Sequence, residues 1–301
     1  MTKTGYVTII GLPNAGKSTL MNALLGERLS IITNKPQTTR KRILGILSDE
    51  NHQIIFLDTP GILDPSYLLQ EKMMKEVERS IDDADLLVAM IDLKTDPKGE
   101  LFFQNDKIIS KLNKLSSKKI LLLNKIDLSD SKSIEQTALL IKEKKIFDRI
   151  LGISALAKFN IDILLETIKE YLPEHPKYYP DDRLTDETER FFVSEIIREK
   201  ILLLYKEEIP YSVEVIIEEF KERAKGKDFV QASIIVERNT QKRIIIGKNG
   251  EAIKKLGEVS RGAIDDFLQR SVYLDLRVKV KSGWRNDNRQ LKKFGYQVGD
   301  E

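Results

Sequence analysis

The stretch GLPNAGKS, residues 11–18, constrains the fold of this chain more than any other. It fits the pattern Gly-x-x-x-x-Gly-Lys-Ser/Thr, follows the apolar run YVTIIG and opens the helical pattern KSTLMNALLG. A glycine-rich turn between a strand and a helix aims backbone N–H groups at one phosphate chain. We therefore expect a nucleotide-binding loop, with Lys17 reaching the β- and γ-oxygens and Ser18 ligating Mg²⁺. The residues expected around the phosphates are Gly11, Asn14, Ala15, Gly16, Lys17, Ser18 and Thr19.

Two further motifs follow apolar runs and complete a nucleotide site. In DTPG, Asp58 can hold Mg²⁺ through water while the Gly61 N–H meets the γ-phosphate. In NKID, Asp127 can accept both N1–H and the exocyclic amine of guanine, a donor pair that adenine lacks. The motifs thus predict GTP or GDP with Mg²⁺. The residues expected around the base are Asn124, Lys125, Asp127, Ser154 and Ala155, with the Ala155 N–H directed at guanine O6.

The order of patterns divides the chain into two domains. Over residues 1–172, apolar strand runs alternate with helical patterns, which predicts an α/β domain with a mostly parallel sheet. The run RILGILSDEN before QIIFLDTPG predicts a hairpin and hence one antiparallel edge strand. Three prolines interrupt the periodicity at 173–183, which we interpret as a linker. Residues 184–301 then follow the order α-β-β-α-α-β, typical of a small α+β domain with a polar tail.

Composition narrows the remaining possibilities. The 301 residues include no cysteine, which excludes disulfides and thiolate chemistry and favours a reducing, cytoplasmic setting. The formal net charge is only +3, so any nucleic-acid signal must be local. No run approaches the roughly 20 apolar residues of a membrane span. His52 and His175 are too isolated for a metal site. We expect a monomer.

These motifs together resemble a translation-factor-class GTPase, and NKPQTTRKRILG resembles the first switch of the bacterial subgroup that includes the Era, TrmE and Der families. By that resemblance, Thr39 binds Mg²⁺ and senses the γ-phosphate, with Thr38 as the other possibility. The expected catalytic set is Lys17, Thr39, Asp58 and Gly61. Ile62 stands where Ras-like GTPases carry a water-orienting glutamine, which predicts slow intrinsic hydrolysis. Asn14 resembles the asparagine of potassium-dependent members, so K⁺ is a further candidate ligand.

A second glycine loop, GKNG at 247–250, lies between an apolar helix end and a second helix start. This arrangement is typical of a KH domain, whose Gly-x-x-Gly loop grips about four nucleotides of RNA by the backbone. Basic residues surround the loop in a chain that is nearly neutral elsewhere. The residues expected to contact RNA are Arg243, Ile245, Ile246, Gly247, Lys248, Asn249, Gly250, Ile253 and Lys254.

A GTPase of this switch type followed by one KH domain of the bacterial type resembles the Era family over essentially the full chain. The resemblance implies binding near the 3′ end of small-subunit ribosomal RNA, maturation of the 30S subunit, and loose association with the membrane face. The alternative is a GTP-regulated protein-interaction module whose basic domain binds an acidic partner. Asp127 opposes a third reading, an ATP-driven RNA remodeller.

Overall fold

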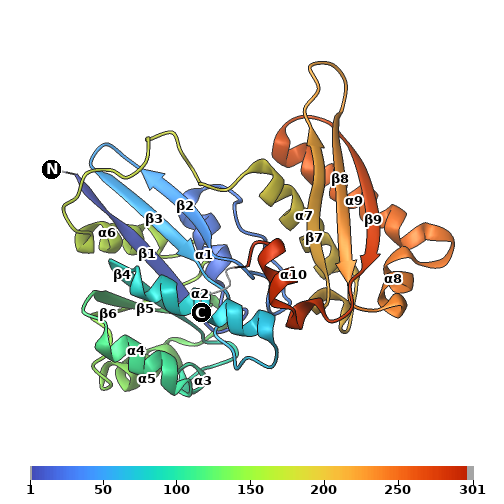
Figure 1. The fold of residues 1–301 in the computed structure, drawn as a ribbon. Coiled ribbons are helices and arrows are strands. Elements are labelled where there is room, and N and C mark those ends of the chain that lie inside the picture. Colours follow the sequence, from blue (N-terminus) through green and yellow to red (C-terminus); the bar gives the residue numbers. More distant parts are fainter. Residues whose placement is uncertain (1, 297–301) are drawn as a thin grey trace. The chain divides into compact units, whose positions relative to one another are not determined.

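The computed structural model describes residues 2–296, which group into two compact units (Figure 1). Residues 2–65 and 73–186 form the first unit, and residues 66–72 and 187–296 form the second. The elements of the amino-terminal half are β1 (Lys3–Gly11), α1 (Lys17–Leu25), β2 (Ile43–Ser48), β3 (His52–Asp58), α2 (Leu68–Asp82), β4 (Leu86–Asp92), α3 (Glu100–Phe103), α4 (Asp106–Lys114), β5 (Lys118–Asn124), η1 (Ile126–Leu128), α5 (Ser131–Lys142), β6 (Arg149–Ile153) and α6 (Ile161–Tyr171).

The strands of the first unit pair in the order β2-β3-β1-β4-β5-β6. All neighbours are parallel except β2 and β3, which confirms the predicted antiparallel edge. Side chains of α2, α3, α4 and α5 share one buried core with β4 and β5. α1 and α6 contact each other and make no contribution to that core among the described residues, as expected for a sheet covered on both faces.

The parallel registers gather several motif residues at one edge of this sheet. Asp58 at the end of β3 pairs with Ile9 of β1, and Asp92 at the end of β4 pairs with Asn124 at the end of β5. The phosphate loop leaves β1 at the same edge. In an open α/β sheet the crevice outside the carboxyl ends of the strands is the usual ligand site.

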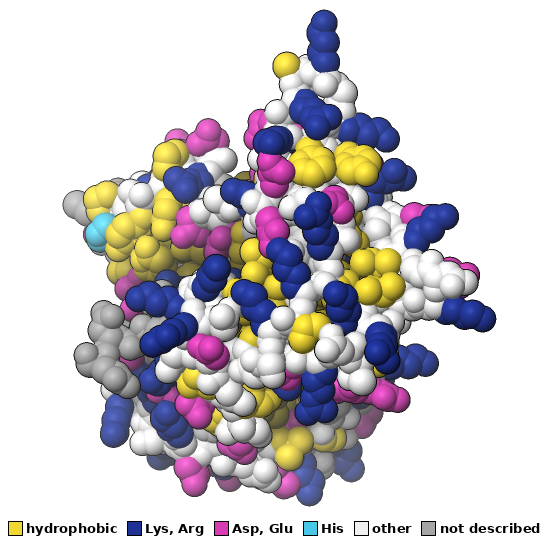
Figure 2. Space-filling model, turned by 45° about the vertical axis from the view of Figure 1, so that its right-hand side comes forward, with side chains coloured by type: hydrophobic (Ala, Val, Ile, Leu, Met, Phe, Trp, Pro, Cys, Tyr) yellow, Lys and Arg dark blue, Asp and Glu magenta, His cyan; other side chains and the backbone are white. Residues whose placement is uncertain are grey.

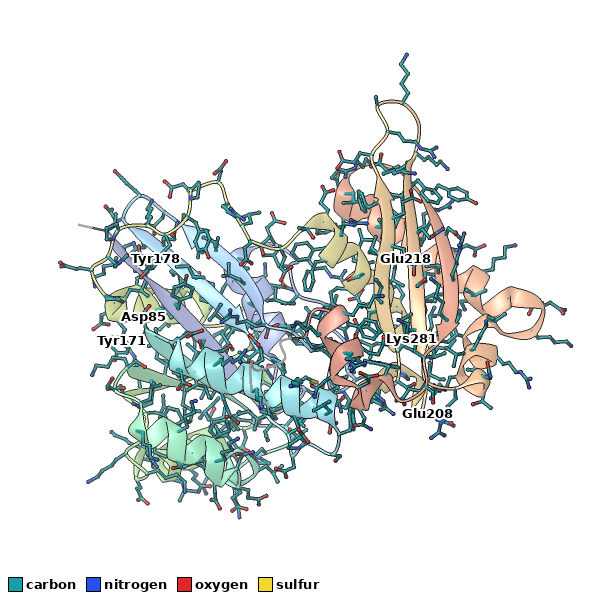
Figure 3. The ribbon with its side chains drawn as sticks, in the orientation of Figure 1. Asp85, Tyr171, Tyr178, Glu208, Glu218 and Lys281 are labelled. Carbon is teal, nitrogen blue, oxygen red and sulfur yellow. The ribbon has the colours of Figure 1, made fainter. Side chains whose placement is uncertain are left out.

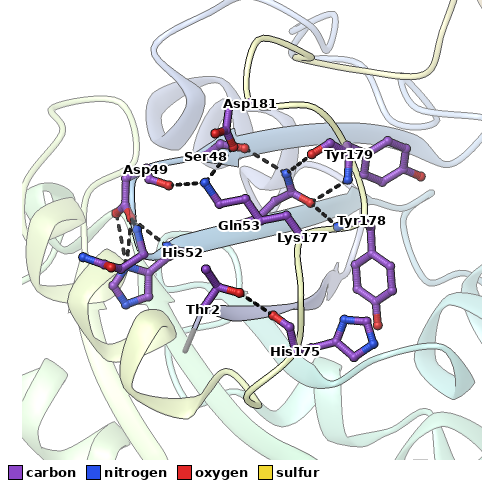
Figure 4. A network of polar contacts seen from close by, with 11 residues as sticks. Thr2, Ser48, Asp49, His52, Gln53, His175, Lys177, Tyr178, Tyr179 and Asp181 are labelled. Atoms are coloured by element: carbon purple, nitrogen blue, oxygen red, sulfur yellow. Dashed lines mark hydrogen bonds and ion pairs between the residues drawn. The ribbon is translucent and has the colours of Figure 1, made fainter.

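The predicted linker, 173–183, is hydrogen-bonded to the first unit along β2 and β3 (Figure 4). The Gln53 side chain donates to the carbonyl of Tyr179 and accepts from the N–H groups of Tyr178 and Tyr179. Beyond the linker, the carbonyl of Leu184 accepts from the Ile46 N–H at 2.7 Å. We call residues 173–185 the strap, because their hydrogen bonds run from Thr4 of β1 past Gln53 of β3 to Ile46 of β2.

The second unit has the elements α7 (Glu189–Leu204), η2 (Ile209–Tyr211), β7 (Glu214–Lys221), β8 (Asp228–Val236), α8 (Asn239–Ile246), η3 (Lys248–Gly250), α9 (Glu251–Leu268), β9 (Val272–Val280), η4 (Trp284–Asn286) and α10 (Asn288–Lys293). β7 and β8 are antiparallel, and β8 and β9 are parallel, which gives the sheet order β7-β8-β9. The predicted order α-β-β-α-α-β is therefore confirmed. α7, α8 and α9 bury one face of the sheet, where Val230, Ala232 and Ile234 alternate along β8.

The described part of the polar tail folds onto the second unit. Trp284 is fully buried and donates from Nε1 to the carbonyl of Ser212. The Tyr296 hydroxyl donates to Glu214 at 2.7 Å. Lys281, which follows β9 (Figure 3), holds its ammonium 5.2 Å from the centre of the Phe294 ring. Trp284 is thus a packing residue of the second unit. Across residues 2–296, the helices are all too short or too polar to span a membrane.

Candidate functional site

The phosphate loop is held in a conformation that its glycines permit. Gly16 has φ +103°, and a Cβ at this position would collide with the Asn124 side chain. A Cβ on Gly11 would lie 2.5 Å from the carbonyl oxygen of Met90. Both glycines therefore let the loop pass close to neighbouring strand ends, which is how the backbone N–H groups come to face one anion.

A cluster of three oxygen side chains lies at the start of α1. The Ser18 hydroxyl donates to Asp58 Oδ2 at 2.7 Å and lies 3.0 Å from the Thr39 hydroxyl, which in turn is 3.4 Å from Asp58 Oδ2. Asp58 is fully buried, and its other oxygen, Oδ1, makes no hydrogen bond within residues 2–296. An orphaned carboxylate oxygen beside two hydroxyls suits a hydrated Mg²⁺, which prefers oxygen ligands and retains several waters. The donor set therefore fits the ion.

The structure distinguishes the two threonines that the sequence left open. Thr39 is buried and lies in the oxygen cluster, whereas the Thr38 hydroxyl donates to the carbonyl of Lys35 at 2.7 Å. Thr38 also lies 2.7 Å from the Thr33 hydroxyl. The geometry therefore favours Thr39 as the Mg²⁺-facing residue of the first switch.

Lys17 lies beneath the loop with its side chain buried. Its ammonium donates to the carbonyls of Gly11 and Leu12 at 3.1 and 3.0 Å. Burial lowers the pKa of Lys17 to about 8, although the Asp58 carboxylate opposes the shift. Burial likewise raises the pKa of Asp58, opposed by the Lys17 ammonium. Both groups are thus less readily charged without a nucleotide, and a phosphate chain would supply the anion that Lys17 needs.

Gly61 and Ile62 follow Asp58 in the chain, and they present backbone groups rather than polar side chains to the phosphate loop. A Cβ on Gly61 would come within 2.8 Å of the Pro13 backbone, so only glycine permits this approach to the phosphate loop. Ile62 is 2% exposed and packs into the core of the first unit. Its side chain consequently has no access to a water molecule beside the γ-phosphate.

A cavity of about 530 Å³ extends from the phosphate loop to the loops after β5 and β6. Asn124 bridges these loops: Nδ2 donates to the carbonyl of Ala15 at 2.8 Å, and Oδ1 accepts from the Ala155 N–H at 3.0 Å. The N–H that we expected to meet guanine O6 is therefore engaged by Asn124 here, and a base would have to share it. Asp127 is exposed at the cavity wall.

Lys125 makes an ion pair with Asp92 that the sequence motifs did not predict. The Lys125 ammonium donates to the carbonyl of Asn14 at 3.2 Å and to Asp92 Oδ2 at 2.7 Å. Asp92 is 5% exposed and lies beside Asn124 in the sheet. Its position after the apolar run LLVAMI, as for Asp58, was the available signal. Leu128 and Leu156, both exposed, also line the cavity and were not among the predicted site residues.

The second glycine loop forms a turn at the start of α9. Gly247, Asn249 and Gly250 have φ values of +74°, +51° and +79°, and a Cβ on Gly247 would lie 2.6 Å from that of Ala252. Lys248 and Asn249 are exposed at its tip. The loop therefore presents one cation and one amide with backbone close behind them, as a phosphate clamp requires.

The flanking residues predicted for RNA divide into two groups. Arg243 and Lys254 are exposed, and Ile246 and Ile253 are partly buried, so these four can line a groove. Ile245 is fully buried in the core, which corrects the expectation that it contacts a base. The helical period explains the difference, because Ile245 faces the sheet from α8 while its neighbour Ile244 is 49% exposed.

Two protein-family models match the chain. One, described as a 50S ribosome-binding GTPase, matches residues 6–125, and one described as a KH domain matches residues 208–285. The chain is 43% identical over 298 residues to GTPase Era of Clostridium botulinum (strain Langeland), covering 99% of both proteins. It is 44% identical to GTPase Era of Clostridium tetani, covering 99% of this chain and 100% of the relative.

Solved structures resemble the chain over the same length. One is a crystal structure of Era in complex with MgGDPNP and nucleotides 1506–1542 of 16S ribosomal RNA, with 40% identity, a TM-score of 0.92, and coverage of 99% of this chain and 100% of that one. Another is an Aquifex aeolicus Era variant bound to GDP and AlF₄⁻, with 40% identity, a TM-score of 0.91 and the same coverage.

Proposed function

The chain belongs to the Era family of GTPases, and on that premise we propose that it is a switch that binds single-stranded ribosomal RNA near the 3′ end of 16S RNA and assists maturation of the 30S subunit. The observation that carries this proposal is the presence of both loops in one chain. The first has the oxygen cluster of a Mg²⁺-nucleotide site, and the second has the glycine turn of an RNA clamp. The solved relative that holds MgGDPNP and 16S RNA supports it.

We assign the roles at the nucleotide as follows. The hydroxyls of Ser18 and Thr39 would hold Mg²⁺, and the unpartnered oxygen of Asp58 would hold it through water. The ion would neutralise negative charge on the phosphates. Lys17 would donate to the same phosphates, and the Gly61 N–H would reach the γ-phosphate, so contacts of Thr39 and Gly61 would depend on that phosphate. Asp127 selects guanine, while Asn124 holds the surrounding loops together.

Potassium is a finer part of the proposal. The Asn14 side chain, exposed on the phosphate loop, donates to the carbonyl of Asn34 in the first switch at 3.2 Å. This pair places an amide oxygen and a backbone carbonyl, both suitable ligands for a monovalent cation, at the phosphate end of the cavity. Ile62 supplies no polar group there. We expect hydrolysis to rise in potassium over sodium and Asn14→Ala to remove the difference; equal rates in both salts would exclude the ion.

The RNA role is tested at GKNG. Replacing Lys248 and Asn249 together by Asp adds repulsion and removes attraction where successive phosphates pass. Affinity for RNA should fall about ten- to a thousandfold, roughly 1.4–4 kcal/mol, and the slope of affinity with salt should become shallower. GTP hydrolysis without RNA should be unchanged. The measurement is fluorescence anisotropy over a salt series, beside a GTPase assay on the same preparations.

Undiminished RNA affinity in a folded variant would refute this assignment and leave the loop to an acidic protein partner. No feature of residues 2–296 favours that alternative.

We also propose that the protein is a cytoplasmic monomer that contacts the membrane peripherally. Exposed Lys292 and Lys293 on α10 support the membrane contact. Analytical sedimentation tests the monomer, and co-sedimentation with anionic vesicles tests the membrane contact. A dimer would contradict the first proposal, and absence of vesicle binding would contradict the second.

A further inference from the structure

The hairpin between β7 and β8 carries a dense group of cations that the proposed function does not use. Its sequence, KERAKGK at 221–227, holds four cations and one acid, and all seven residues are exposed. We call this segment the hairpin tip. Gly226, with φ +92°, makes its turn. Figure 2 shows blue Lys and Arg side chains gathered on this hairpin at the top of the view, with hydrophobic side chains directly below.

The acids at the base of the hairpin are engaged by a different cation. Arg270 contacts Asp228 at 2.6 Å, Glu222 at 3.8 Å and Glu189. The Arg223 N–H also donates to Asp228, and these contacts hold the pKa of Asp228 below its ordinary value. Arg270 thus offsets the negative charge of these carboxylates. The positive charge of the tip is left facing outward.

Two aromatic rings lie next to the tip on the same face of the sheet. The strand register places Lys221, Phe229 and Tyr273 in one row across β7, β8 and β9. The rings of Phe229 and Tyr273 are 5.9 Å apart and nearly parallel, at 14°. Tyr273 is 59% exposed, whereas the next residue on β8, Val230, points into the core on the opposite face. A supported, exposed ring beside cations is the arrangement that stacks a nucleic-acid base.

Farther along this outer face, charges are balanced. Glu218 of β7 (Figure 3) accepts from Ser233 and pairs with Lys279. Asp275 pairs with Arg277 at 3.0 Å. The excess of positive charge on the sheet is therefore confined to the hairpin end, which defines where an anionic ligand would lie.

The hairpin tip and GKNG lie at opposite ends of α9. The helix begins directly after Gly250, and shortly after its end the carbonyl of Ser271 accepts from the Asp228 N–H at the base of the hairpin. Its 18 residues span about 27 Å at 1.5 Å per residue. At about 3.4 Å per stacked nucleotide, a strand needs roughly eight nucleotides to cover that distance. At this spacing, the roughly four nucleotides gripped at GKNG would not reach the tip.

We propose that the hairpin tip and Tyr273 form a second contact for single-stranded RNA, in which Arg223, Lys225 and Lys227 bind phosphates and Tyr273 stacks on a base. It extends the RNA segment bound by this domain beyond the four nucleotides of the glycine clamp. The proposal rests on RNA binding at GKNG. The cations alone would suit any anionic surface, but the exposed planar ring beside them favours a ligand with bases.

The test compares RNA lengths. The long probe is the 3′-terminal 20 nucleotides of small-subunit ribosomal RNA, and the short probes are six-nucleotide segments tiled across it. Lys225→Glu with Lys227→Glu should weaken the long probe about tenfold at 0.1 M salt, and flatten its log–log salt slope by about 1.4, or about 0.7 per lost phosphate contact. Tyr273→Ala should weaken it about five- to a hundredfold, and Tyr273→Phe should restore binding. The tightest six-nucleotide segment should bind every hairpin variant as it binds wild type.

The control with the same change in net charge is Lys142→Glu with Lys145→Glu; Lys142 is the last residue of α5, Lys145 lies in the turn after it, and both are exposed. If hairpin variants bind the long probe like this control, the inference is overturned. If they lose only binding to anionic vesicles, the surface contacts lipid instead and the inference is equally wrong. If the Lys248→Asp, Asn249→Asp variant weakens neither probe, the proposed RNA function itself fails, which separates the two failures.

Discussion

At the scale of single residues, burial changes the chemistry of Lys17. Because its pKa is lowered to about 8, the nucleotide-free protein loses this proton as the pH rises through 8, whereas bound phosphates hold it on. GDP binding must then take up a proton, so affinity falls with rising pH. We expect proton uptake per GDP to be small at pH 7 and to grow as the pH rises through 8. Calorimetry in two buffers of different ionisation enthalpy measures it.

A lysine-selective NMR titration provides the control for Lys17. One lysine signal should titrate near pH 8 in the nucleotide-free protein and should stop titrating there once GDP is bound. Proton uptake that is absent at pH 9, or a titrating signal that persists with GDP, would contradict the assignment of Lys17 to the phosphates.

Asp127 carries the second residue-scale prediction. If its carboxylate accepts the paired donors of guanine, Asp127→Asn should lower GTP affinity at least a hundredfold and shift preference toward xanthosine nucleotides, whose exchanged groups suit an amide. Asp130→Asn is the matched control, because Asp130 is a nearby exposed carboxylate whose Oδ1 caps α5 by accepting from the Ser133 N–H. Competition against labelled GDP measures both. Similar losses in the two variants would show a local folding effect rather than base selection.

At the scale of elements, one buried amide holds the middle of the strap. Gln53 is fully buried and exchanges hydrogen bonds with Tyr178, Tyr179 and Ser48. Gln53→Leu keeps the volume and removes every bond, so unfolding free energy should fall by about 1–3 kcal/mol and the strap should become a protease site. Asp181→Ala, which removes the ion pair with Lys177 and leaves the Lys177 hydrogen bond to the Asp49 carbonyl in place, should cost less than about 1 kcal/mol. If both variants lose the same unfolding free energy in denaturant titrations, the ion pair stabilises the strap as much as the Gln53 hydrogen bonds do.

The sequence predicted the helices and strands whose hydrophobic pattern matches the burial of their side chains in the structure. The Era family, the parallel sheet with its antiparallel edge and the KH order are confirmed, because glycine motifs and apolar runs are local signals. The segment LFFQNDKIISKLNKL has apolar residues at helical spacing throughout but forms two helices, α3 and α4, because the Asn105 side chain accepts from the Ile108 N–H and starts a new helix. The ion pair of Asp92 with Lys125 and the choice of Thr39 over Thr38 depend on loops meeting in space, which spacing does not encode.

At the scale of the whole molecule, the question is where the first domain ends. Prolines predicted an end at residue 172, with a linker to 183. In the structure the strap is hydrogen-bonded to the first unit. The Thr4 N–H donates to the carbonyl of Pro173, and the Thr185 hydroxyl donates to the carbonyl of Leu44. Pro-rich sequence breaks helical periodicity without implying mobility, because a proline-containing segment can still be held by its other backbone groups. We propose that the first domain extends to residue 186.

Two fragments test this boundary. A fragment of residues 1–172 lacks the strap, whereas 1–186 retains it, and both contain the whole nucleotide site. The shorter fragment loses about 3 kcal/mol of hydrogen bonding and packing, which should lower its melting temperature by roughly 6–12 °C. Saturating GDP should raise both melting temperatures, since the bound state of each is stabilised by the same affinity. Equal melting temperatures would mean that the strap only rests on the sheet. A fragment 1–186 that fails to fold would contradict an autonomous first domain.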